Sequence, residues 1–160
     1  SPATSEILQQ QMELGQKMFT ETLEARRALA EIGSVQKQLS DLEQKLGETN
    51  PALKRALAAA QSEMAEILAK KETDAEAGLQ GAYTDLASAL HVVEGGDRAV
   101  PSQAIAVYEE ASQHIKVGIA QWTSFKQTKL PPLNQELGQA NLAPVAISEI
   151  EHEVLFLMTR

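Results

Sequence analysis

Three histidines and many glutamates are the residues of this 160-residue chain whose types suggest chemistry. Glu149 and His152 are three residues apart, a spacing that places a carboxylate and an imidazole on one helical face, as in di-iron bundle proteins. Such a site needs a second Glu-x-x-His and two further glutamates, and no second Glu-x-x-His occurs here. Glu149 and His152 are therefore the metal candidates, but the pattern predicts no complete metal site.

Other forms of catalysis lack their sequence signals. The chain has no cysteine, which excludes thiol nucleophiles and disulfides, and no Gly-x-Ser-x-Gly element. Glutamate-based hydrolysis needs two carboxylates across a cleft, one with a pKa raised by burial, and a rod of solvated glutamates supplies neither. Glu110 and His114, four residues apart, are read as a simple helix pair. We expect no enzyme activity, no catalytic residues and no cofactor.

The charge balance narrows the range of partners. The 22 acidic residues outnumber the 14 basic ones, giving a net charge of −8, and the basic pairs are isolated among acids. Nucleic acids and anionic membranes are bound by basic surfaces, so neither is an expected partner. No apolar run approaches the roughly 20 residues of a membrane-spanning helix.

A stripe of apolar residues, spaced alternately four and three residues apart, dominates the first half of the chain. This spacing is typical of helices that pack along a seam, and the stripe resumes after a turn at residues 47–51. Two helices with matching seams are expected to form an antiparallel hairpin. The seam residues are Ala28, Ile32, Val35, Leu39, Leu42 and Leu46, then Leu53, Leu57, Ala60, Met64 and Ile67.

Glycines and prolines divide the rest of the chain, and Pro131-Pro132 is expected to end the last long helix. The second and third helices together match the first in length, so we expect them end to end beside it. The prediction is one all-α domain, an elongated antiparallel bundle of three layers with a segmented middle layer, or alternatively a compact four-helix bundle. Its expected elements are helices at 5–46, 51–71, 79–94 and 102–129, then a return and apolar tail at 130–160.

Two residues near the expected return have predicted structural roles beside Pro131. Trp122 is the only tryptophan and lies on the helical seam, so we expect it to pack under the return at residues 130–137. Asn134 is expected to hydrogen-bond backbone groups left exposed by the prolines.

The second half of the chain resembles a known family. The resemblance covers roughly residues 79–145 and points to the C-terminal helical region of large bacterial proteins built on sortilin-like β-propellers of neuraminidase repeats, often labelled glycosyl hydrolases. It rests on Ala82-Tyr83-Thr84-Asp85-Leu86, Glu94-Gly95-Gly96-Asp97, Val100-Pro101-Ser102-Gln103, Tyr108, Trp122 and Leu130-Pro131-Pro132-Leu133-Asn134-Gln135-Glu136-Leu137.

The resemblance implies a helical appendage of a larger extracytoplasmic protein, periplasmic or secreted. The propeller and its aspartate-box repeats are not in this sequence, so the resemblance implies no sugar- or peptide-directed activity for any residue here.

Apolar residues that one narrow seam cannot bury indicate an interaction surface. The first helix has them around much of its circumference, and the tail has a further cluster. We expect self-association or docking to the missing propeller domain, and the overall expectation is a non-catalytic interaction or oligomerisation module. The alternative is a ligand- or metal-binding bundle that uses Glu149 and His152. The predicted interface residues are Ile7, Leu14, Met18, Phe19, Phe156 and Leu157.

Overall fold

The computed structural model describes residues 2–69, 78–95 and 99–147, and within these ranges every regular element is a helix. Thus Glu149, His152, Phe156 and Leu157 lie outside the described residues. The elements are α1 (Pro2–Leu46), α2 (Pro51–Leu68), α3 (Leu79–Glu94), α4 (Ser102–Thr128) and α5 (Leu130–Gln139).

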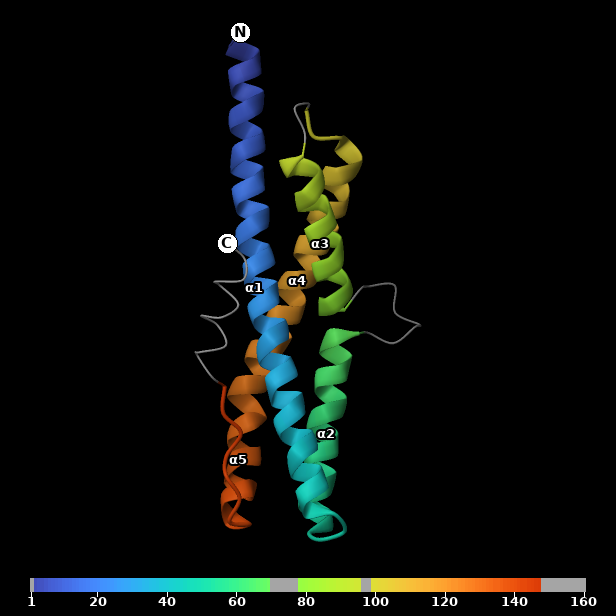
Figure 1. The fold of residues 1–160 in the computed structure, drawn as a ribbon, viewed down its shortest axis with the longest axis vertical. Coiled ribbons are helices and arrows are strands. Elements are labelled where there is room, and N and C mark those ends of the chain that lie inside the picture. The colour runs from blue at the N-terminus through green and yellow to red at the C-terminus, as the bar shows by residue number, and fades with distance from the viewer. Residues whose placement is uncertain (1, 70–77, 96–98, 148–160) are drawn as a thin grey trace.

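The helices form three antiparallel rods (Figure 1). The first rod is α1, the second is α2 and α3 placed end to end, and the third is α4 followed by α5. The segment α3 packs against both α1 and α4, while α2 packs against α1. The prediction of an elongated all-α bundle with a segmented middle layer is confirmed, and the helices do not form a compact four-helix bundle.

The turn between α1 and α2 follows from its residue types. Gly47 has φ +56°, a left-handed conformation that glycine adopts without steric cost. Asn50 is also left-handed, with φ 49°, and its side chain accepts a hydrogen bond from the Leu53 amide at 3.3 Å. Pro51 opens α2, where its missing N–H leaves no helical bond unmade.

The core consists of the seam side chains. Ile32, Val35 and Leu39 of α1 are fully buried, as are Leu57 and Met64 of α2. The upper half of the bundle continues this core with side chains from α3 and α4. Its fully buried members include Leu79, Leu86, Ile115 and Trp122.

The last long helix, α4, ends at Thr128 beside the paired prolines, as predicted, but the chain does not turn back there. The helical path is interrupted only at Lys129, and α5 continues in the direction of α4, with Leu130 as its first residue. Proline fits the first turn of a helix because the N–H groups there have no intrahelical acceptor. Three buried leucines, at positions 130, 133 and 137, anchor α5. The chain therefore turns back after Gln139, not at the prolines.

Replacing glycine with alanine should have opposite effects on stability at two positions in helix interiors. A Cβ on Gly118 would lie 3.1 Å from the Cβ and Cδ1 atoms of Leu79, which is fully buried, whereas a Cβ on Gly33 meets nothing within 4 Å. Gly33→Ala should raise the free energy of unfolding by about 0.5–1 kcal/mol through helix propensity. Gly118→Ala should lower it by about 1 kcal/mol because the α3–α4 contact is overpacked. Urea unfolding measures both, and equal stabilisation would contradict the close approach.

Candidate binding surfaces

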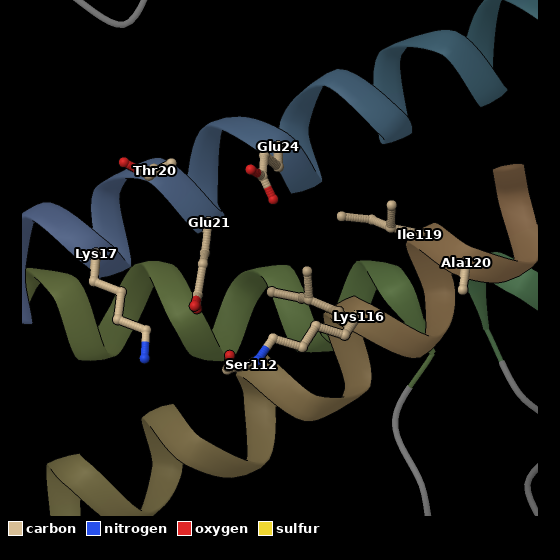
Figure 2. A pocket seen from close by; sticks show the side chains of 9 residues that line it. Lys17, Thr20, Glu21, Glu24, Ser112, Lys116, Ile119 and Ala120 are labelled. Carbon is tan, nitrogen blue, oxygen red and sulfur yellow. The ribbon is translucent and has the colours of Figure 1, made fainter.

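A groove of about 620 Å³ lies between α1 and α4 in the upper half of the bundle (Figure 2). Its wall on α1 includes Lys17, Glu21 and Glu24, and its wall on α4 includes Ser112, Lys116 and Ile119.

The groove has balanced charges. Two lysines and two glutamates line it, and Lys17 and Lys116 extend toward its interior from opposite helices (Figure 2). The balance gives no net field that would concentrate a charged ligand. Across the part of the chain that the structure describes, no three His, Asp or Glu side chains gather closely enough to hold a metal ion.

Glu21, which lines this groove, pairs with Tyr108 of α4. The Tyr108 hydroxyl donates to Glu21 Oε1 at 3.1 Å, while Glu21 Oε2 is buried and has no hydrogen-bond partner among the described residues. Burial raises the pKa of the Tyr108 phenol, and the negative charge of Glu21 raises it further. Both effects disfavour the phenolate.

The Tyr108 pKa leads to a prediction about alkaline pH. The folded-state pKa lies above the unfolded value of about 10, so the neutral phenol stabilises the fold. This stability is present below pH of about 10 and is lost as the pH rises through the folded-state pKa. In a Tyr83→Phe variant, which has one phenol, the ultraviolet absorbance of tyrosinate should appear at higher pH in folded than in urea-unfolded protein. If the folded and unfolded proteins titrate at the same pH, the buried contact between Tyr108 and Glu21 is contradicted.

Trp122 connects α4 to α1, which differs from the expected role beneath the return. Its side chain is 1% exposed, and Nε1 donates to Glu31 Oε1 at 3.2 Å. Lys126 Nζ donates to the same oxygen at 2.7 Å and lies 5.7 Å from the centre of the Trp122 ring. The Phe125 ring stacks on the indole with centroids 5.4 Å apart. The buried Glu31 carboxylate is therefore positioned by two donors from α4.

The return segment is held by two side-chain amides, which we call the amide clamp, Gln38 and Asn134. Asn134 accepts from the Val145 N–H at 2.8 Å and donates to the Val145 carbonyl at 3.2 Å. Gln38 accepts from the Ala146 N–H at 3.0 Å and donates to the Ala146 carbonyl at 2.7 Å. Asn134 therefore bonds backbone groups of the return segment, whereas the predicted partners were backbone groups beside the prolines. Pro131 is exposed at the beginning of α5.

The predicted interface residues of α1 have different environments. Ile7 and Phe19 are 42% and 41% exposed, Leu14 is half-buried, and Met18 is fully buried within the bundle. Met18 is thus a core residue in this structure and is not available to a partner. A further large apolar side chain, Leu8, is 51% exposed, and Met12 is 66% exposed. Leu8 was not among the predicted interface residues, although its position next to Ile7 and off the main seam indicates an exposed apolar side chain.

The first turns of α1 extend beyond the rest of the bundle (Figure 1). Gly15 lies level with Val93, near the end of α3, because a Cβ at Gly15 would be 3.7 Å from Val93 Cγ1. The part of α1 before Gly15 therefore extends past the end of α3, and every residue from 4 to 10 is exposed.

Fold and surfaces together define the chain as an all-α bundle of three antiparallel rods with an overhanging first helix. Comparisons with protein-family models, with curated proteins and with solved structures gave no match. In residues 2–69, 78–95 and 99–147, no helix has both the length and the apolarity needed to cross a bilayer.

Proposed function

We propose that the chain is a non-catalytic helical interaction module that self-associates through an outer stripe of α1, defined as Leu8, Met12 and Phe19. The carrying observation is that these three large apolar side chains are 41–66% exposed in the overhanging part of the helix and beside it. At 100° per residue they fall within roughly 40° of one another around the helix axis. Such a contiguous apolar surface is typical of a contact site.

The charge distribution permits a second copy as the partner at the outer stripe only. Two molecules that each carry a net charge of −8 repel one another, so they can meet only where the surface lacks charge. Around the outer stripe the neighbours are uncharged, namely Ser5, Gln9, Gly15 and Gln16. Three side chains cover far less than the roughly 800 Å² that each partner of a stable complex buries. A weak dimer, with a Kd on the order of micromolar, is therefore expected.

Docking to a propeller domain is the alternative form of the same function. The resemblance of residues 79–145 supports it, as it supports an extracytoplasmic location. In that case the tail residues Phe156 and Leu157 and the exposed Ile7 are the proposed additional contacts.

The test is a concentration series of the whole chain by native mass spectrometry and sedimentation, purified without chelators. The wild type should form dimers, and Met12→Glu should weaken dimerisation at least tenfold. Val117→Glu is the matched control, because Val117 is an exposed valine, 37% accessible, on α4, and it should leave the dimer unchanged. A wild-type monomer at every concentration would refute self-association.

A ligand-binding bundle is the second candidate, supported by the groove between α1 and α4. Its apolar surface, two ammonium groups and the unsatisfied Glu21 Oε2 beside it fit an amphipathic molecule with a hydrogen-bond donor. Monomers that carry a stoichiometric bound mass in the same native spectra would favour this function over self-association.

A further inference from the structure

The amide clamp fixes the position of the last described residues of the chain. Four hydrogen bonds grip two consecutive residues, Val145 and Ala146, from opposite sides, with Asn134 on α5 and Gln38 on α1. Val145 is buried, and the half-buried Ile147 packs against the core. The last described residues of the chain therefore lie against α1 close to Gln38.

A continuous face of α1 leads from the clamp away from the core. At 100° per residue, Ser34, Ala30 and Leu23 lie within roughly 80° of Gln38 around the axis, on the side opposite the fully buried Ile32. These side chains are small or apolar and half-buried. Arg27 lies among them and is exposed, so the face has one positive charge. We call residues 23, 27, 30 and 34 the clamp face.

The sequence after the clamp complements this face. Ile147, Ile150, Val154 and Leu157 repeat at intervals of three and four, the spacing that predicts one apolar side of a helix. Glutamates at 149, 151 and 153 flank this apolar side and have the charge opposite to Arg27.

The length of the segment also fits. The 13 residues from 148 to 160 span about 20 Å as a helix, which matches the rise of 13 residues of α1. Counted back from Gln38, this covers the clamp face as far as Arg27 and approaches Leu23. It ends short of the outer stripe at Leu8 and Met12.

We propose that residues 148–160 dock in cis on the clamp face of α1, where they pack beside the three rods of the bundle. The amide clamp directs them to this face. This docking is independent of the proposed self-association, because the two surfaces occupy different parts of α1. It excludes the alternative in which Leu157 contacts a propeller domain.

The absence of cysteine permits a direct test by disulfide formation in the full chain. An Ala30→Cys, Val154→Cys pair places thiols at opposed positions eight residues from the clamp on each segment. A disulfide requires Cα atoms within about 7 Å, so oxidation reports close approach. The matched control is Ser62→Cys with Val154→Cys, because Ser62 is exposed on α2. Circular dichroism of both reduced proteins verifies that they fold.

We expect the Ala30–Val154 pair to form an intramolecular disulfide, seen as a faster-migrating monomer, at least tenfold faster than the control pair. Adding Gln38→Ala and Asn134→Ala should reduce this advantage, because the clamp no longer directs the segment. Equal rates for the test and control pairs would overturn the proposal. A disulfide-linked dimer as the main product would overturn docking in cis and assign the face to the tail of a second copy.

Discussion

Replacing Trp122 with alanine should lower the free energy of unfolding by about 3–5 kcal/mol, the range typical of a fully buried large aromatic residue. The indole is 1% exposed and stacks on Phe125, so its removal leaves a cavity between α4 and α1. The Glu31 carboxylate would also lose one of its two α4 donors. Urea unfolding followed by circular dichroism measures the loss.

The variant Trp122→Phe separates packing from hydrogen bonding. Phenylalanine keeps most of the apolar volume but has no N–H, so we expect a smaller loss of about 1–2 kcal/mol. If Trp122→Ala costs less than 1 kcal/mol, the indole does not occupy the buried position between α1 and α4.

Replacing Lys126 with methionine should lower the free energy of unfolding by about 2–4 kcal/mol, since it removes the counter-charge from a buried carboxylate. Lys126 Nζ lies 2.7 Å from Glu31 Oε1; the side chain of Glu31 is only 7% exposed, and that of Lys126 is 32% exposed. Losing a cation that contacts a buried carboxylate oxygen costs more than losing a surface ion pair. Denaturant unfolding of the variant gives the value.

A surface pair provides the matched control for this experiment. Lys37 Nζ lies 3.1 Å from Asp41 Oδ2, but these side chains are 79% and 63% exposed, so Lys37→Met should cost less than about 0.5 kcal/mol. Adding Glu31→Gln to Lys126→Met should recover part of the loss, because the amide still accepts from Trp122 without a buried charge. Equal effects of Lys126→Met and Lys37→Met would contradict a buried ion pair.

These two predictions concern the joint between α1 and α4, which we define as Glu31, Trp122 and Lys126. The outer stripe and the clamp face both lie on α1, which this joint holds against α4. The Glu31–Lys126 contact holds the third rod against α1, and the clamp holds the return against the same helix further along. A loss of dimerisation in Trp122→Ala without loss of folding would point to coupling between the joint and the stripe.

The sequence by itself determined the helical class and the seam. Apolar spacing of three and four depends on the period of the helix, a local property, so Ile32, Leu39, Leu57 and Met64 were identifiable as one packed surface. Turn chemistry is also local, which is why the break at Gly47 and the start at Pro51 appear where the residue types predict them.

Only the tertiary structure decided which polar groups meet and which apolar groups remain outside. Gln38 binds Ala146 across 108 residues and Glu31 binds Trp122 across 91, and no local pattern encodes such pairs. Ile7 and Met18 lie within roughly 20° of one another around the α1 axis, yet Met18 is fully buried and Ile7 is 42% exposed, because α3 ends near the level of Gly15 and does not reach Ile7. Helical periodicity assigns a residue to a face, but its burial depends on the length and position of the neighbouring rods.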